Sequence, residues 1–179
     1  MSVEKENASL VLNTRDAVAS DNKATHTWNN INLESLLEGM YDKYDSFNLC
    51  LSFAMSMTNA VNSYGAGTTV NDRNLLIYVN GLPFKAQCYN AGTNRISNQT
   101  VLGYLQFPTD TTTSSTSPSF QSFYVATFTK NAPLCNITIQ LKRMDNTLPT
   151  VNNDLPNIVY CFDIYGIDSK TKLIDNRMK

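Results

Sequence analysis

The most regular stretch of the sequence is Phe47-Asn48-Leu49-Cys50-Leu51-Ser52-Phe53-Ala54-Met55-Ser56-Met57-Thr58. In this stretch, large apolar residues alternate with small or polar ones. Successive side chains of a β-strand point to opposite faces of the sheet, so the pattern predicts a long strand with one face in a core. The side chains on the expected core face are Phe47, Leu49, Leu51, Phe53, Met55 and Met57.

A second stretch alternates in the same way and predicts a second half-buried strand. Its two faces are Cys135, Ile137, Ile139 and Leu141 on one side and Asn136, Thr138, Gln140 and Lys142 on the other. We expect Ile137 and Ile139 to be buried. The opposite face, with Thr138, Gln140 and Lys142, is expected to meet solvent or a partner.

Further apolar segments lie between clusters of Gly, Pro, Asn and Ser, as strands do in all-β proteins. These segments are 10–13, 25–31, 75–79, 101–107, 120–129 and 157–167. Together with the two alternating stretches they predict about eight antiparallel strands, the number typical of a sandwich or barrel. Asn80-Gly81 follows one of these segments and favours a tight hairpin, because both residues accept a positive φ.

One segment has the period of a helix instead. Its apolar residues recur three and four positions apart and are Leu33, Leu36, Leu37, Met40, Tyr41 and Tyr44. They predict one short helix of about three turns that covers an open end of the sandwich. Asn32 is expected to cap its start, and Gly39 to weaken its interior by about 1 kcal/mol relative to Ala.

The length and composition fit a single domain. The chain has 179 residues, of which only 16% are charged. A chain of this length buries roughly 70% of its unfolded surface and needs neither disulfides nor a metal to form a core. We expect a flexible N-terminal arm at 1–8, one sandwich domain at 9–168 and a C-terminal tail at 169–179. The polar segments 59–71 and 109–119 are expected to be loops within that domain.

Charge and hydropathy exclude several classes of partner. The net charge is −1 and no basic cluster occurs, whereas proteins that bind nucleic acid directly need clustered Lys and Arg. No window approaches the roughly 20 apolar residues of a membrane span. The first residues, Met1-Ser2-Val3-Glu4-Lys5, lack the apolar run of a secretory signal. We therefore expect synthesis in the cytoplasm.

Residues with catalytic or metal-binding chemistry are few. The sequence has one histidine, His26, which we expect at the surface or in a capping position. The four cysteines, Cys50, Cys88, Cys135 and Cys161, stand apart from one another, and we expect four buried, reduced thiols without a disulfide. We predict no catalytic residue, no bound metal and no cofactor, and hence no enzyme.

Three other features are better explained without chemistry. Asp42 and Asp45 lie close together but lack the further oxygen ligands of a calcium site, so we expect them to face water. Asp163 lies inside an apolar strand, and an edge position or a partner contact would explain it. Gly65-Ala66-Gly67 has no following Lys-Ser/Thr and is not a phosphate-binding loop.

The order of several motifs resembles a known family. These motifs are Trp28-Asn29-Asn30-Ile31-Asn32-Leu33, the helical segment 34–44, Phe47-Asn48-Leu49-Cys50-Leu51, Ile77-Tyr78-Val79-Asn80-Gly81-Leu82-Pro83-Phe84, Leu102-Gly103-Tyr104 and Asn157-Ile158-Val159-Tyr160-Cys161-Phe162-Asp163-Ile164-Tyr165-Gly166. From about Leu10 to Ile167, the chain resembles the single jelly-roll penton and minor capsid proteins of large icosahedral double-stranded DNA viruses.

This resemblance implies a fold and a function. It implies a single jelly-roll β-sandwich that acts as a structural virion protein, either at the vertices or as a minor subunit of the shell. The implied partners are copies of itself in a cyclic pentamer and other capsid proteins, including the major capsid protein. The family has no catalytic residues to transfer to this chain. A β-sandwich recognition module that binds a glycan or a receptor is the alternative function.

Overall fold

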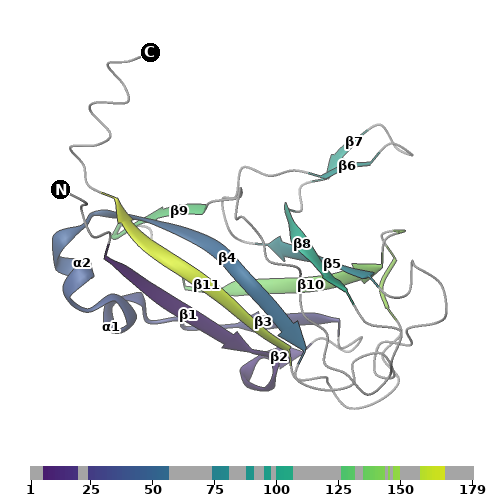
Figure 1. Cartoon of the computed structure of the whole chain (residues 1–179), viewed down its shortest axis with the longest axis horizontal. Coiled ribbons are helices and arrows are strands. Elements are labelled where there is room, and N and C mark those ends of the chain that lie inside the picture. Colours follow the sequence, from purple (N-terminus) through teal and green to yellow (C-terminus); the bar gives the residue numbers. More distant parts are fainter. Residues whose placement is uncertain are drawn as a thin grey trace.

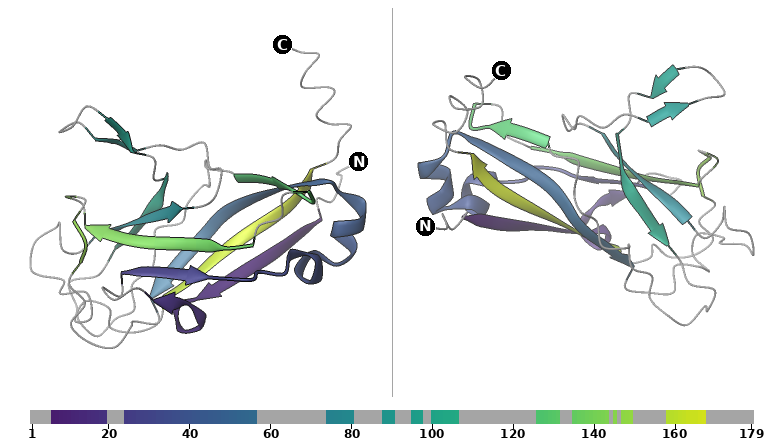
Figure 2. Two further views of the ribbon diagram at one scale, coloured as in Figure 1. Left: turned by 180° about the vertical axis from the view of Figure 1, so that it is seen from behind. Right: turned by 45° about the horizontal axis from the view of Figure 1, so that its top comes forward.

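The chain is an all-β sandwich, as the alternating stretches predict. The computed structural model describes residues 6–19, 24–56, 74–80, 88–90, 95–97, 100–106, 126–131, 135–143, 145, 147–149 and 158–167. Two antiparallel sheets form its two layers (Figures 1 and 2). The four-stranded sheet has the order β1 (Asn7–Asn13), β11 (Ile158–Ile167), β4 (Ser46–Ser56) and β9 (Ala126–Thr129). The five-stranded sheet has the order β2 (Val18–Ala19), β3 (Thr25–Trp28), β10 (Ile137–Arg143), β5 (Asn74–Asn80) and β8 (Thr100–Gln106).

All the strands expected from the sequence have a counterpart in these two sheets. Three short strands were not expected: β2, and the pair β6 (Cys88–Asn90) and β7 (Arg95–Ser97), which hydrogen-bond to each other. The tight hairpin expected at Asn80-Gly81 falls partly outside the described residues, because Gly81 and the residues up to 87 are not described, and β6, the next described strand, does not pair with β5. Both sides of β5 are already occupied, by β10 and by β8.

The core lies between the two sheets. Its largest fully buried side chains are Tyr160, Phe47, Phe162, Leu49, Leu75, Ile77, Leu105, Ile137, Ile139, Leu141 and Ile158. Both layers contribute to this set, so each sheet buries one face against the other. The expected burial of Leu49, Leu51, Ile137 and Ile139 is confirmed.

Phe53 is the exception, and its predicted burial is wrong. Its side chain is 43% exposed, whereas that of the next residue, Ala54, is 1% exposed. The cause is a β-bulge: Phe162 of β11 lies opposite Leu51, and Cys161 lies opposite Phe53. Ser52 is therefore the extra residue on β4, and it reverses which side chains face the core beyond that point.

The predicted single helix is two short helices at one end of the sandwich (Figure 1). They are α1 (Leu33–Leu37) and α2 (Gly39–Lys43), and the break between them falls at Glu38, with φ 35° and ψ −114°. A positive φ cannot continue a right-handed helix, so the segment changes direction there. The predicted cap is confirmed, because the Asn32 side chain accepts a hydrogen bond of 3.1 Å from the Ser35 amide.

The helices cover the core with the face that their apolar period predicts. Leu33, Leu37 and Met40 are buried in the core cluster. Tyr44 packs directly on the backbone of β11, where a Cβ at Gly166 would lie 2.3 Å from its ring. Only glycine at position 166 therefore leaves room for the Tyr44 ring, at the end of α2, to lie this close to β11.

The domain begins earlier than expected. Asn7 and Ala8, assigned above to a flexible arm, belong to β1, where they lie opposite Tyr165 and Ile164 of β11. Pairing with β11 places these polar and small residues in a regular strand. Residues 1–5, the tail at 169–179 and the expected loops at 59–71 and 109–119 lie outside the described residues.

Candidate interaction surface

The candidate functional surface is the face of the four-stranded sheet that points away from the core. Strand register sets its side chains in rows across β1, β11 and β4. From one end of the sheet to the other, the rows are Asn7–Tyr165–Asn48, Ser9–Asp163–Cys50, Val11–Cys161–Phe53 and Asn13–Val159–Met55. This outer face is thus polar over two rows and largely apolar over the other two.

Asp163 is the centre of the polar half. Its carboxylate accepts hydrogen bonds from the Ser9 hydroxyl at 3.3 Å, from the Ser52 hydroxyl, and from the Tyr165 hydroxyl at 3.5 Å. Its strand, β11, lies between β1 and β4, so the edge position considered above is wrong. A charged group in a central strand loses hydrogen bonds to water. Three hydroxyl donors, one of them on the bulged residue Ser52, compensate for that loss at Asp163.

The electrostatics of this cluster keep its neighbours protonated. Partial burial, and then the negative charge of Asp163, raise the pKa of the Tyr165 hydroxyl. The same two causes, in the same order, raise the pKa of the Cys161 thiol. Both groups are therefore neutral at physiological pH, and Tyr165 remains a hydrogen-bond donor to Asp163. A raised thiol pKa also makes Cys161 a poor nucleophile.

The apolar half of the face exposes large side chains. Val11 is 59% exposed and Phe53 43% exposed, and the half-buried Val159 and Met55 lie in the adjoining row. Cys161 lies between Val11 and Phe53 and is buried. The solvent-facing side of an antiparallel sheet is usually polar. An apolar row beside a hydrogen-bonded carboxylate has the composition of a contact surface for another protein.

The opposite face of the molecule differs in chemistry. On the five-stranded sheet, the outward side chains of β3 and β10 hydrogen-bond to one another, Thr27 to Thr138 at 3.0 Å and Gln140 to Thr25 at 3.1 Å. The Lys142 ammonium lies 4.7 Å from the centre of the Tyr78 ring. The accessibility expected for Thr138, Gln140 and Lys142 holds in part, because all three are half-buried.

His26 does not lie at the surface, so that expectation is wrong. It is fully buried and shares the inward face of β3 with Trp28, whose ring centre is 6.2 Å away. Within the described part of the chain, neither ring nitrogen has a hydrogen-bond partner. Burial alone lowers the pKa of the imidazole from 6.5 to about 4, so His26 is neutral in the folded protein at physiological pH.

The other candidate residues do not converge on a site. Asp42 is exposed on α2, and Asp45 is exposed beside Lys130, whose ammonium lies 3.7 Å from its carboxylate. Cys50, Cys135 and Cys161 form no disulfide; Cys50 and Cys161 are buried as expected, but the expected burial of Cys135 is wrong, because it is exposed just before β10 begins. The Cys88 side chain and Gly65-Ala66-Gly67 lie outside the described residues. Among the described residues, no group of three or more His, Cys, Asp or Glu side chains is placed to hold a metal ion.

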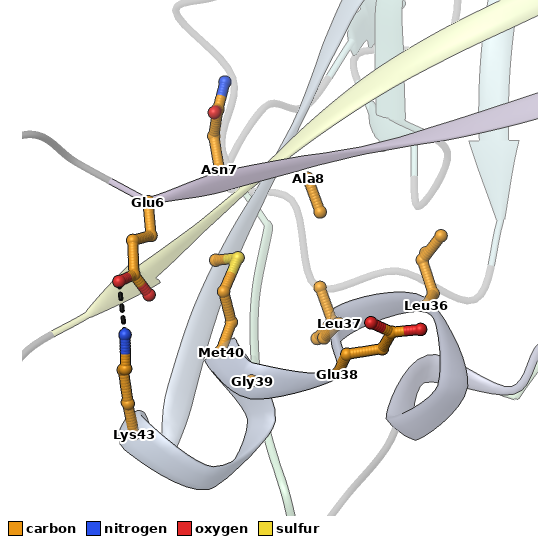
Figure 3. Close-up of a pocket in the computed structure, with 9 residues that line it drawn as sticks. All are labelled: Glu6, Asn7, Ala8, Leu36, Leu37, Glu38, Gly39, Met40 and Lys43. Atoms are coloured by element: carbon orange, nitrogen blue, oxygen red, sulfur yellow. Dashed lines mark hydrogen bonds and ion pairs between the residues drawn. The ribbon is translucent and has the colours of Figure 1, made fainter.

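An open pocket of about 400 Å³ lies between the start of β1 and the two helices (Figure 3). Its apolar wall consists of Ala8, Leu36, Leu37 and Met40. Glu6, Glu38 and Lys43 surround this wall, and Glu6 and Lys43 form an ion pair across one side. The hydrogen bond and the negative charge of Glu6 raise the pKa of Lys43, so the Lys43 ammonium stays charged at physiological pH.

Comparisons with protein-family models, curated proteins and solved structures gave no match for this chain. No helix in the described ranges has the length and apolar character needed to cross a membrane.

Proposed function

We propose that this chain is a structural subunit of an icosahedral virus shell, a penton or minor capsid protein with a single jelly-roll domain. The strand pairing is the observation that carries this proposal. Among the eight longer strands, the first pairs with the last (β1 with β11), the second with the seventh (β3 with β10), the third with the sixth (β4 with β9) and the fourth with the fifth (β5 with β8).

This order is what results when one long hairpin of strands wraps around a core. It supports the assignment as a jelly roll, a double-sheet arrangement common in viral capsid domains. Jelly rolls also occur in lectins and cupins, so the fold alone leaves the function open. The surface chemistry supports assembly, because Val11 and Phe53 expose apolar area on a sheet face that already holds a hydrogen-bonded carboxylate.

The proposed partners are copies of the chain around a closed cyclic axis and neighbouring capsid proteins. Closed symmetry limits the growth of such an assembly, and isolated vertex rings often need the surrounding shell for stability. The proposed location is the virion, after synthesis in the host cytoplasm. The alternative, a module that binds a glycan, would need exposed aromatic side chains for stacking. None of the residues that line the pocket is aromatic, and the exposed aromatic side chains among the described residues, Phe53 and Tyr104, lie on different sheets.

The position of the chain in an intact particle tests the proposal. Cryo-microscopy or cross-linking mass spectrometry of purified particles should place it at the vertices or beneath the facets. Native mass spectrometry of the isolated protein at micromolar concentration should show rings or larger oligomers if the ring is stable alone. Recovery only outside particles, as a monomer that binds a glycan array, would overturn the proposal in favour of the recognition module.

A further inference from the structure

β1 is an edge strand without the usual protection. In the described part of the chain it lies at the end of the four-stranded sheet and pairs with β11 alone, in an unbroken register of seven residue pairs. Its sequence, Asn-Ala-Ser-Leu-Val-Leu-Asn, has no charged residue, no proline and no bulge. Soluble proteins usually block such an edge with Lys, Pro or a bulge, because an open edge pairs with other chains.

The other sheet edges are less suited to pairing. β2 has two residues and β9 has four, and β9 is followed by Lys130, which is paired with Asp45. β8 has seven residues, but a register shift opposite Ile77 and Tyr78 interrupts its ladder. Of the described edges, β1 alone is long, uncharged and regular.

The backbone of β1 is available on its outer side. In the ranges that the structure describes, the recorded backbone hydrogen bonds of Asn7–Leu12 are those of its ladder with β11. The carbonyl of the last residue, Asn13, accepts a 3.0 Å hydrogen bond from the Trp28 indole. Strand addition therefore has room from Asn7 to Leu12, whereas Asn13 is already anchored to β3.

The pocket adjoins this same edge. Its lining comes from Glu6, Asn7 and Ala8 at the start of β1 and from α1 and α2, and none of its residues belongs to β11 (Figure 3). The strand residues that line it, Asn7 and Ala8, thus belong to the edge strand alone, and the pocket lies between the start of that strand and the two helices. A chain that continued the sheet past β1 would run alongside the pocket.

We propose that β1 and this pocket together bind an extended segment of a protein partner, which adds to the four-stranded sheet as a fifth strand and places one apolar side chain in the pocket. Main-chain hydrogen bonds would supply affinity, and the pocket would supply specificity, as in other cases of strand addition. The inference deepens the assembly function proposed above, because it names the contact by which a neighbouring shell protein is held.

The pocket also sets the chemistry of the segment. Its wall of Leu36, Leu37 and Met40 favours an aliphatic side chain such as Leu or Met. Lys43 is already paired with Glu6, whereas the exposed Glu38 has no recorded ion-pair partner in the described part of the chain. A Lys or Arg two residues from the apolar anchor, on the same face of the added strand, would therefore complement Glu38.

A labelled peptide tests this inference on the isolated, full-length protein. The probe has six residues, the length of the open stretch Asn7–Leu12, with Leu at one end so that it can lie beside Ala8, Lys two positions from the Leu, and otherwise alternating Val and Ser. Fluorescence anisotropy should show saturable binding, and N-methylation of alternate peptide amides should abolish it, because a methylated nitrogen cannot donate to β1. Equal binding of the methylated peptide would overturn strand addition.

Two sets of protein variants locate the site. Val11→Lys charges the β1 edge and should abolish binding, whereas Val18→Lys, at an equally exposed valine of β2, should leave it unchanged. Glu38→Lys should weaken binding of the Lys peptide by up to about fivefold and favour a peptide with Asp in its place. These positions are exposed, so the variants should fold, which circular dichroism would verify.

The results separate this inference from the function on which it rests. Absence of peptide binding, or equal loss in Val11→Lys and Val18→Lys, would overturn strand addition at β1 and would leave the location of the chain in a particle unaffected. Absence of the chain from particles, together with specific peptide binding, would overturn the capsid function and leave β1 as a peptide-binding edge.

Discussion

β4 and β10 have the two clearest alternating patterns in the sequence, yet only β10 keeps its pattern along its whole length. In β10, Ile137, Ile139 and Leu141 are all fully buried. In β4, Leu49 and Leu51 are buried but Phe53 faces outward. The difference arises where β4 pairs with β11, because Ser52 is an extra residue on β4 that has no partner in β11. Alternation therefore predicts burial only as far as the ladder is regular.

The largest expected effect lies in the regular strand. Ile139→Ala on β10 removes fully buried methylenes and leaves a cavity between the sheets, which should lower the free energy of unfolding by about 2–5 kcal/mol. Gln140→Ala, the adjacent half-buried position, should cost about 0.5 kcal/mol or less. Urea denaturation curves of the two variants measure both values. Equal losses would show that β10 does not follow its alternation.

A feature of the fold could be predicted from the sequence where it depends on residues close together in the chain, and not where it depends on a strand that is distant in sequence. Alternation, turn residues and apolar period are local, and they give the longer strands, the Asn32 cap and the apolar face of the helices. The bulge at Ser52 depends on β11, more than 100 residues away in sequence, and no pattern within β4 distinguishes Phe53 from Leu51. The break at Glu38 has one weak local sign, the adjacent Gly39.

The candidate surface was less predictable than the fold. The sequence marks Asp163 as unusual, because a carboxylate stands out in an apolar strand, but it does not identify the partners of this carboxylate. Ser9 and Ser52 come from strands that are distant in sequence, so only the sheet register brings them together. The sequence carries no signal for this role of Ser52, because Ser52 occupies a position where the alternation already predicts a small or polar residue.

The second effect is a dependence of the free energy of unfolding on pH, and it arises from His26 on β3, the neighbour of β10. His26 lies opposite Ile139, and burial lowers its pKa from 6.5 to about 4. The unfolded chain therefore binds a proton between those values and the folded chain does not, so stability is complete above pH 6.5 and falls as the pH decreases. The loss should reach about 2 kcal/mol near pH 5.

The variant His26→Leu should remove this part of the pH dependence, because leucine does not titrate. Urea denaturation of both proteins between about pH 7.5 and pH 5 measures the difference, and the variant corrects for carboxylates that titrate in the same range. Parallel curves for the two proteins would contradict a neutral, buried imidazole and would place His26 in contact with solvent or with a hydrogen-bond partner.

The third effect examines what holds the bulge in β4. Ser52→Ala removes a hydroxyl that donates to the Asp163 carboxylate, and a hydrogen bond to a charged, half-buried group should contribute about 1 kcal/mol. Ser9→Ala is the matched control, because its hydrogen bond to the same carboxylate is long, at 3.3 Å, and exposed. Its cost should be smaller. A greater loss in Ser9→Ala, measured by urea denaturation, would show that the bulged residue is not the main support of Asp163.

The smallest expected effect on stability is that of replacing Phe53, and it tests whether this side chain lies in the core, as simple alternation predicts, or outside it, as the bulge requires. Simple alternation places Phe53 in the core, where truncation of a phenylalanine costs about 3–5 kcal/mol. The bulge places it outside, and Phe53→Thr, which keeps a residue that favours strands, should change the free energy of unfolding by about 0.5 kcal/mol or less. Leu51→Ala, two positions away and buried, should cost about 2–5 kcal/mol in the same assay.

Phe53→Thr should nevertheless impair assembly, because it removes the largest exposed side chain of the apolar row that begins at Val11. Co-expression with the other shell proteins, followed by quantification of the chain in purified particles, measures this effect. A variant that is as stable as the wild type but poorly incorporated separates the role of this face from that of the core. Normal incorporation would show that partners contact the chain elsewhere, and the β1 edge would then be the next surface to alter.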